Sequence, residues 1–219
     1  MGTNGTGPES GSQSVRTIPL GRRPRSERSD AARNRQRILD AAAALIRQRG
    51  VDVITMDDVA AAAGVGKGTL YRRFGDKGGL AEALLDRRES ELQEAILTGP
   101  PPLGPGADPA DRLRAFFGAY ADLLERDGRL LLVAETSTPA SRYHSGAYAF
   151  WHAHVVALLG RAGAEVDAAV VAHLLLAGVA ADLYQHLRRG EGRPPGRIAE
   201  ALADVAAAVA APPGRRSRR

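Results

Sequence analysis

The stretch TMDDVAAAAGVGKGTLYRRFGDK, residues 55–77, carries the signals of two short helices joined by a tight turn. Thr55 can cap the first helix, and Asp58 three residues later can complete a capping box. Gly64 can adopt the left-handed conformation that ends a helix in a tight turn. A second helix is expected from about Gly66 to Phe74. The stretch therefore predicts a helix-turn-helix.

The second helix has two faces of different character. Leu70 and Phe74 lie four residues apart, on the side expected to pack against the core. The other positions carry hydrogen-bonding side chains or glycine: Lys67, Gly68, Thr69, Tyr71, Arg72 and Arg73. A polar outer face over an apolar inner face is what entry into the major groove of DNA requires. This helix is therefore predicted to bind double-stranded DNA.

The roles of the DNA-binding residues follow from their positions. We expect Lys67, Gly68, Thr69 and Arg72 to face base edges and the neighbouring backbone. Thr55, Tyr71 and Lys77 are expected to hold phosphates, which fixes the register of the protein on DNA without specifying sequence. Lys67 and Lys77 are the two lysines of the whole chain, and both fall in this segment.

The same stretch resembles the DNA-binding segment of the tetracycline-repressor (TetR) family of bacterial regulators. The resemblance covers roughly residues 33–97 and rests on these positions: Thr55, Asp58, Val59, Ala60, Gly64, Val65, Lys67, Gly68, Thr69, Leu70, Tyr71, Phe74 and Lys77. Gly66 replaces a common serine, and Gly78 and Gly79 replace better helix formers. The helix after Lys77 is therefore expected to begin loosely, because glycine destabilises helices.

A competing interpretation concerns GVGKGT, residues 64–69, which is similar to the end of a phosphate-binding loop. Such a loop needs glycine at position 61 and serine or threonine directly after the lysine. Position 61 is alanine and position 68 is glycine. An alanine-rich helix is also predicted before this stretch, where a strand is needed. Nucleotide binding is therefore disfavoured, and no cofactor is expected.

Composition limits the remaining classes of function. The chain of 219 residues has no cysteine, which excludes disulfides and thiolate metal sites. No apolar run reaches the roughly 18 residues of a membrane span, and the N-terminus lacks the apolar core of a signal peptide. A soluble cytoplasmic protein without membrane contact is expected. The net charge is +5, and residues 1–37 hold eight arginines against three acidic residues. These basic residues are compatible with phosphate contacts or with a solvated arm.

Periodicity predicts an all-α fold of about nine helices in two domains. Residues 1–29 are expected to form a disordered basic arm, and residues 30–97 a helix-turn-helix DNA-binding domain. The Gly-Pro-rich stretch 99–106 marks the boundary. Residues 107–211 are expected to form a helical domain for effector binding and dimerisation, followed by a basic tail at 212–219. Within this domain, Gly128 is expected to interrupt one helix, Pro139 to stop the next, and 167–189 to form one long helix.

The last two long helices carry a predicted dimer interface. Ile198, Leu202, Val205 and Val209 repeat at spacings of four, three and four, which is typical of a coiled-coil seam. Leu175 and Gly178 on the preceding helix extend this surface, and the small glycine permits close approach. The resemblance implies a four-helix dimer core, and two half-sites of a palindromic operator need two recognition helices. Packing of the seam inside one subunit is the alternative.

Aromatic and histidine side chains gather in the C-terminal half, on helices that surround an effector cavity in similar regulators. The predicted pocket residues are Phe117, Tyr120, Tyr148, Trp151, His152 and His173, with Asp182 as a further polar candidate. Core packing is the alternative for each of them. Asp182 and His186 are spaced to pair on a helix. No histidine pair has metal-ligand spacing, and no catalytic constellation is recognised, so neither a metal site nor an enzyme is expected.

Together these features predict a homodimeric repressor that an unidentified small-molecule effector releases from its operator. A ligand achieves this only through unequal affinity for two states of the protein. Activation instead of repression stays open, as does a basic DNA-binding protein of low specificity without an effector. A nucleotide-binding enzyme that uses the loop at residues 64–69 is the less favoured third alternative.

Overall fold

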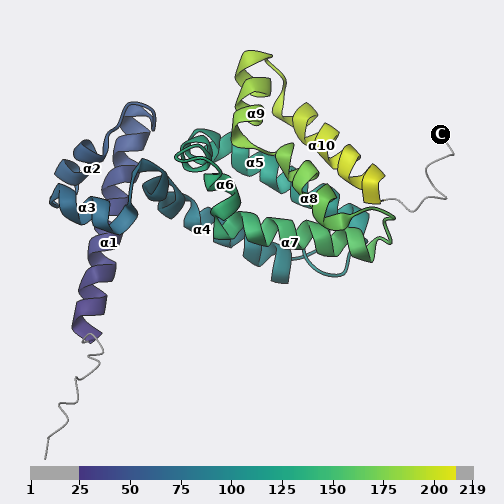
Figure 1. Ribbon diagram of the computed structural model, residues 1–219, viewed down its shortest axis with the longest axis horizontal. Coiled ribbons are helices and arrows are strands. Elements are labelled where there is room, and N and C mark those ends of the chain that lie inside the picture. The colour runs from purple at the N-terminus through teal and green to yellow at the C-terminus, as the bar shows by residue number, and fades with distance from the viewer. Residues whose placement is uncertain (1–24, 211–219) are drawn as a thin grey trace, which may run out of the picture. The chain divides into compact units, whose positions relative to one another are not determined.

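A computed structural model describes residues 25–210 of the chain, with side chains described from residue 29 onward. The described residues form helices and turns, without a strand among them (Figure 1). The predicted all-α fold is therefore confirmed. Residues 1–24 and 211–219 lie outside the described residues, and with them most of the predicted N-terminal arm and all of the basic tail.

The chain divides into two units, residues 1–35 and residues 36–219. Helix α1 (Arg25–Arg49) begins in the first unit, earlier than the predicted start near Asp30. Within this unit, Arg33 forms an ion pair with Asp30, one turn before it.

The helix-turn-helix has its own apolar core. Helix α1 contributes to this core with residues that follow Gln36, the first residue of the second unit. Helices α2 (Met56–Ala62) and α3 (Lys67–Phe74) pack on it. Its buried members come from four helices and from the turns on either side of α2: Ile38, Leu39, Ala42, Ile54, Met56, Val59, Ala60, Ala63, Leu70, Phe74 and Leu80. The two residues predicted to face this core from α3, Leu70 and Phe74, are buried there.

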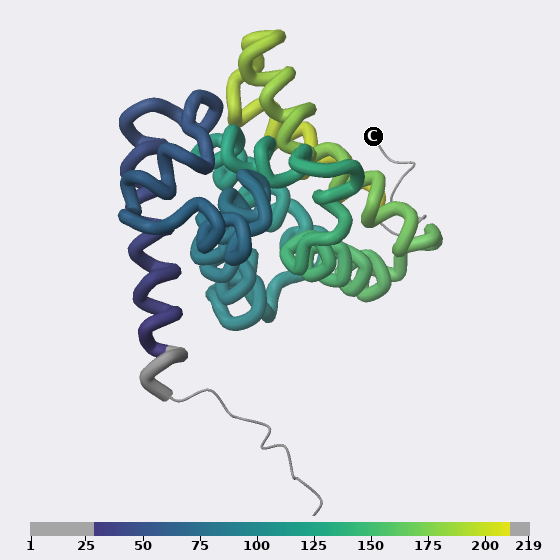
Figure 2. The backbone as a smooth tube through the Cα atoms, turned by 60° about the vertical axis from the view of Figure 1, so that its left-hand side comes forward, coloured from purple at the N-terminus to yellow at the C-terminus, as the bar shows by residue number. Residues whose placement is uncertain are grey.

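The remaining helices build a larger core around one long central helix. They are α4 (Lys77–Thr98), α5 (Pro109–Glu135), α6 (Ser141–His144), α7 (Gly146–Arg161), α8 (Ala168–Ala177), α9 (Ala181–Gln185), the π-helical turn η1 (His186–Gly190) and α10 (Pro195–Ala210). Figure 2 follows the chain from α4 through the turn at 99–108 into α5. Helix α5 contacts α4, α7, α9 and α10, so it forms the centre of this domain.

The structure corrects the predicted interruption at Gly128. Helix α5 runs without a break to Glu135 and ends there, before Pro139. A side chain at Gly128 would lie 2.5 Å from Nε2 of Gln185, so this glycine makes room for α9 instead of ending a helix. The Thr136 hydroxyl donates to the Leu132 carbonyl at 2.7 Å at the end of α5.

The predicted continuous helix at 167–189 is also wrong. A turn at 178–180 separates α8 from α9, and the α9 segment continues into η1. Gly178 lies so close to α10 that a methyl group on it would meet the Leu202 side chain at 2.5 Å. The break also exposes backbone groups that distant side chains satisfy, as described below. Sequence periodicity does not record such partners.

Residues 168–190 are long and apolar enough to cross a membrane, by length and composition alone. This finding differs from the expectation that no such run exists. The stretch is divided by the turn at 178–180, and Ala172, Leu175 and Leu176 on it belong to the C-terminal core. We therefore interpret it as core helices.

Candidate DNA-recognition surface and ligand site

The turn between α2 and α3 forms through local hydrogen bonds. Gly64 has a φ of 61°, in the left-handed region. The Val65 amide donates to the Ala60 carbonyl at 3.0 Å, and the Gly64 amide donates to the Ala61 carbonyl at 3.1 Å. This is the Schellman arrangement, which satisfies the last carbonyls of a helix. The predicted turn at Gly64 is therefore confirmed.

The capping box at the start of α2 is present as predicted. The Thr55 hydroxyl accepts from the Asp58 amide at 3.1 Å, and the Thr55 amide donates to Oδ2 of Asp58 at 2.8 Å. These hydrogen bonds from Thr55 hold the pKa of the Asp58 carboxyl below its usual value. The Thr55 hydroxyl also donates to the same carboxylate at 2.7 Å. The expected phosphate contact of Thr55 therefore competes with a local cap.

Helix α3 presents the side chains expected to face DNA. Lys67, Gly68, Tyr71 and Arg72 are exposed, and Thr69 is half-buried. No atom lies within 4 Å of the position that a Cβ would take on Gly68, so another backbone can approach there. The side chain of Arg72 makes no hydrogen bond or ion pair with any residue that the structure describes. The outer surface of α3 is therefore open to a partner.

Lys67 and Lys77, the two lysines of the segment at 55–77, each have a partner within the chain. Lys67 forms an ion pair with Asp57 of α2, and this hydrogen bond raises the pKa of the lysine. Nζ of Lys77 donates to the Asp52 carbonyl at 3.3 Å. Exposed pairs of this kind contribute little to stability. Both lysines can therefore exchange these partners for a phosphate at small cost.

The predicted effector residues fall into two neighbouring groups. Phe117, Tyr120 and Trp151 are buried with Phe116, and the ring centroids of Tyr120 and Trp151 are 5.9 Å apart. In the second group, the Tyr148 hydroxyl lies 2.7 Å from Nδ1 of His173. The rings of His152 and His173 stack at 4.1 Å. The predicted pair of Asp182 with His186 does not form, because His186 contacts Glu191 and Asp182 accepts from the Leu183 amide.

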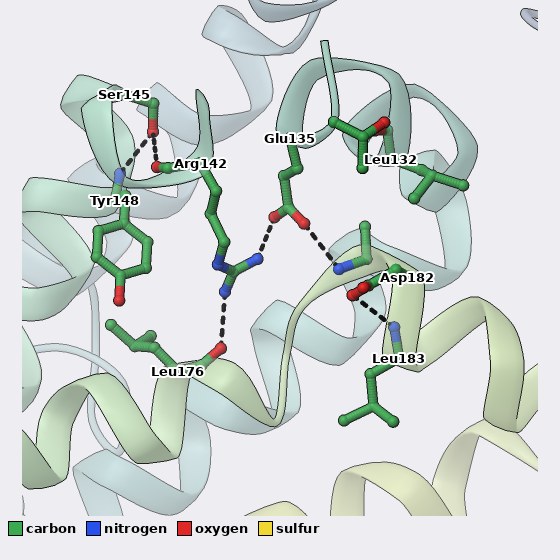
Figure 3. A network of polar contacts seen from close by, with 10 residues as sticks. Leu132, Glu135, Arg142, Ser145, Tyr148, Leu176, Asp182 and Leu183 are labelled. Atoms are coloured by element: carbon green, nitrogen blue, oxygen red, sulfur yellow. Dashed lines mark hydrogen bonds and ion pairs between the residues drawn. The ribbon is translucent and has the colours of Figure 1, made fainter. Parts of the chain in front are cut away.

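A buried ion pair that the sequence analysis missed joins four helices (Figure 3). Arg142 of α6 pairs with Glu135 at the end of α5, and the two side chains are 10% and 12% exposed. Arg142 also donates to the Leu176 carbonyl at 2.7 Å, and the Ala181 amide donates to Glu135 at 2.8 Å. The pair thus satisfies backbone groups on both sides of the break between α8 and α9. Burial raises the pKa of the Glu135 carboxyl, and Arg142 opposes that shift.

The predicted dimer residues share one groove, apart from Val209. The groove has a volume of about 520 Å³ and lies between α8, α9, η1 and α10. Leu175, Gly178, Ile198, Leu202 and Val205 line it, whereas Val209 packs against the C-terminal core. Leu174 and Leu183, which the sequence analysis did not select, add 68% and 40% exposed side chains to this surface.

No group of three histidine, cysteine, aspartate or glutamate residues that could hold a metal ion occurs within residues 25–210. The stretch at 64–69 follows helix α2, whereas a phosphate-binding loop follows a strand. The recognition surface is therefore the feature with the clearest chemistry.

Comparison with known proteins shows which family this part of the chain is similar to. Residues 38–84 match the family model described as bacterial regulatory proteins, tetR family. This segment is similar to the N-terminal segment of TetR-family regulators. The resemblance seen in the sequence is thus confirmed. An HTH-type transcriptional regulator of Staphylococcus aureus is 45% identical over 60 residues, which are 27% of this chain and 32% of the relative. The chain thus spans about a third of the length of the curated relatives it matches.

Solved structures extend the similarity of the fold to most of the chain. A TetR-family regulator from Rhodococcus has a TM-score of 0.57 at 24% identity, over 82% of this chain and 100% of that one. A regulator from Saccharomonospora viridis in complex with choline has a TM-score of 0.56 at 22% identity, over 79% and 95%. AibR in complex with isovaleryl coenzyme A and operator DNA has a TM-score of 0.53 at 22% identity, over 78% and 97%. These similarities establish the two-domain helical fold.

Proposed function

We propose that this chain is a cytoplasmic, homodimeric regulator of transcription that binds a palindromic DNA operator and is released by a small-molecule effector. The observation that carries the proposal is the exposed polar face of α3 over buried Leu70 and Phe74, within a TetR-family segment. We assign residues 30–97 to DNA binding and residues 107–211 to effector binding and dimerisation. No enzymatic activity is proposed.

On DNA, we assign Lys67, Gly68, Thr69 and Arg72 to base edges and the adjacent backbone. Arg72 is the strongest candidate for reading a base, because it is exposed and has no partner among the described residues. An arginine recognises guanine through two parallel hydrogen bonds in the major groove. Thr55, Tyr71 and Lys77 are assigned to phosphates.

The groove between α8 and α10 supports dimerisation. Leu174, Leu183 and Val205 are large apolar side chains exposed beside it, and such patches on one chain are typical of surfaces that bind another. A second copy of the same surface makes a two-fold interface in which each chain covers the other. Two recognition helices related in this way match the two half-sites of a palindrome.

Two contacts support coupling between the C-terminal domain and the recognition segment. A methyl group on Gly78 would lie 2.1 Å from Cβ of Ser137, so the start of α4 packs tightly on the turn after α5. Arg129 of α5 also pairs with Asp52, whose carbonyl accepts from Lys77. Gly78 therefore allows a close contact, in place of the loose helix start expected from the sequence.

This coupling predicts a defect in Gly78→Ala that Ser137→Gly partly reverses. The alanine methyl displaces the turn at 136–140, which alters the position of α4 relative to the effector domain. We expect Gly78→Ala to weaken operator binding and the double variant to recover part of it, as measured by fluorescence anisotropy. Equal defects in the single and double variants would contradict this coupling. Gly68→Ala is no control here, because it lies on the DNA surface, whereas Gly118→Ala is a suitable one.

Sequencing of retained genomic DNA tests the function. The purified chain is incubated with sheared DNA of its source genome, and bound fragments are sequenced. We expect a small number of sharp peaks that share an inverted repeat near promoters. Uniform coverage would overturn the proposal and favour a basic DNA-binding protein of low specificity. If a reporter gene placed behind such a site is activated by the protein, the proposed repressor is an activator. The proposal that it recognises specific DNA would still hold.

The effector part of the proposal is supported by the solved complexes of similar fold, one with choline and one with isovaleryl coenzyme A. Those ligands differ in charge and size, so they do not define the effector of this chain. The chemical class of the effector has to be inferred from the residues of this chain's own C-terminal domain.

A further inference from the structure

The break between α8 and α9 forms part of the groove that carries the proposed dimer interface. Leu175 and Gly178 line this groove from the α8 side of the break, and Leu183 lines it from the α9 side. A methyl group on Gly178 would meet the Leu202 side chain of α10 at 2.5 Å, so α10 packs directly on the break. The course of the chain at 178–180 therefore sets the relative positions of the apolar side chains on both sides of it.

The local sequence does not explain why α9 begins at Ala181. This helix has five residues, and Ala180 at its N-cap position makes no side-chain hydrogen bond. A helix this short is unstable alone, and alanine is a poor N-cap. The missing acceptor comes from α5, because Oε2 of Glu135 accepts from the Ala181 amide at 2.8 Å. A carboxylate from a distant part of the chain thus takes the place of a local capping side chain.

Arg142 holds the other side of the break. Its Nη2 atom donates to the Leu176 carbonyl at 2.7 Å, one residue before α8 ends. The Val179 amide donates to the same carbonyl at 3.1 Å, and Leu176 is completely buried. Arg142 also pairs with Glu135, and their side chains are 10% and 12% exposed. One buried ion pair therefore joins the backbone contact before the break to the contact after it.

The two charged residues stand at the ends of one short turn. Residues 136–140 connect Glu135, the last residue of α5, with α6, in which Arg142 is the second residue. The Ser141 hydroxyl lies 3.0 Å from the Ser137 hydroxyl, and Ser141 is 8% exposed. Contacts inside the turn thus limit the separation of Glu135 and Arg142. The pair has little freedom to follow a different course of the chain at the break.

We propose that the buried pair of Glu135 with Arg142 positions the break between α8 and α9, and thereby fixes the shape of the surface that a second copy of the chain covers. The inference rests on the proposed dimer and names residues that control it, although neither of them lines the groove. Both are positioning residues, because they act through the backbone of Leu176 and Ala181. In a two-fold dimer the same change occurs in each copy, so a displaced break alters both halves of the interface.

A purely stabilising role of the pair predicts a different outcome. Desolvation offsets much of the attraction in a buried ion pair, and apolar side chains of similar size are often tolerated in its place. Apolar replacement of both residues keeps the volume of the pair but removes the acceptor for Ala181 and the donor for Leu176. A stabilising role predicts unchanged dimerisation of the folded variant. A positioning role predicts a folded variant that dimerises poorly.

Sedimentation equilibrium of the full chain measures the dissociation constant of the dimer. The test variant is the double substitution Glu135→Leu with Arg142→Met. Its matched control, Glu91→Gln with Arg87→Gln, removes an exposed ion pair. We expect the control to dimerise like the wild type and the test variant to dimerise about 10-fold more weakly or worse, within the usual range of coupling between two sites. Val205→Asp places a charge on an exposed residue of the groove and should prevent dimerisation.

The contrary results separate this inference from the proposed dimer. Equal dissociation constants for the wild type and the test variant, both folded by circular dichroism, would overturn the positioning role but keep the dimer. A monomeric wild type, with Val205→Asp behaving like it, would contradict the dimer itself and the inference with it.

Arg142→Lys replaces the test variant if the latter does not fold. Lysine keeps the positive charge beside Glu135 but lacks the planar fork with which Arg142 also reaches the Leu176 carbonyl. Weaker dimerisation of folded Arg142→Lys would support the positioning role, and unchanged dimerisation would overturn it.

Discussion

The segment at 55–77 and the ion pair of Glu135 with Arg142 place their charged side chains in opposite surroundings. Lys67 and Arg72 are exposed, and their neighbours in sequence position them. The side chains of Arg142 and Glu135 are only 10% and 12% exposed, and they bind backbone groups 34 and 46 residues away. Exposed charges are available to a partner at small cost, whereas buried charges determine the structure around them. The first region therefore suits recognition of DNA, and the second suits control of conformation.

The largest effect is expected when the buried pair is broken. Glu135→Gln leaves the Arg142 guanidinium without its counterion and weakens the cap on Ala181. We expect a loss of about 3 to 5 kcal/mol in the free energy of unfolding, measured by denaturant titration. Glu91→Gln, which breaks an exposed pair with Arg87, is the matched control, with a loss of about 0.5 kcal/mol or less. Similar losses of stability in the two variants would show that the Glu135–Arg142 pair contributes no more than an exposed ion pair.

The half-buried carboxyl of Glu89 makes the stability of the fold depend on pH. Its pKa in the folded chain is about 7, above the ordinary value of 4.5, because burial disfavours the ionised form. As pH rises from 4.5 to 7, the unfolded chain has lost this proton but the native chain still holds it, so Glu89 progressively destabilises the fold. Above pH 7 the native chain has lost the proton as well, and the destabilisation by Glu89 has reached its full value.

We therefore expect Glu89→Gln to be more stable than the wild type above pH 7, by about 1 to 3 kcal/mol. The gain should vanish below pH 4.5, where the wild-type carboxyl is protonated in both states. Denaturant titrations of the two chains between pH 4 and 8.5 measure it. A stability difference that does not change with pH would show that Glu89 is solvated like an ordinary surface carboxyl.

Arg72→Ala tests whether the exposed region reads sequence. We expect a loss of about 1 to 3 kcal/mol in binding to the preferred duplex, together with relaxed preference at one base pair of each half-site. Competition with single-substitution duplexes measures both quantities, and Arg87→Ala on α4 serves as the control. A uniform loss across all duplexes would reassign Arg72 to a phosphate.

Lys77→Ala is expected to have the smallest effect. If this lysine exchanges the Asp52 carbonyl for a phosphate, its removal lowers the slope of log affinity against log salt by about 1. Titrations at several salt concentrations measure the slope. An unchanged slope would mean that Lys77 keeps its contact with Asp52 on DNA.

The sequence predicted the features whose partners lie a few residues away. The capping box of Thr55 with Asp58 and the turn at Gly64 depend on local hydrogen bonds, and both were correct. The buried face of α3 followed from helical spacing. The contacts of these residues with DNA stay predictions.

The features that the sequence analysis missed depend on distant parts of the chain. The break between α8 and α9 occurs where Arg142 and Glu135 satisfy backbone groups, and no local pattern at Gly178 indicates such partners. The role of Gly128 depends on Gln185 in the same way. Glu89 was within reach of sequence reasoning, because it interrupts the apolar spacing of Leu85, Leu92 and Ile96.

Selection of DNA from a random pool is the most direct test of the central claim, that the exposed face of α3 reads a specific sequence as part of a dimer. The purified chain is incubated with the pool at physiological salt, and bound DNA is amplified and sequenced over several rounds. The account predicts a palindromic motif whose two half-sites have a fixed spacing. Recovery of unenriched DNA by a folded protein would contradict it.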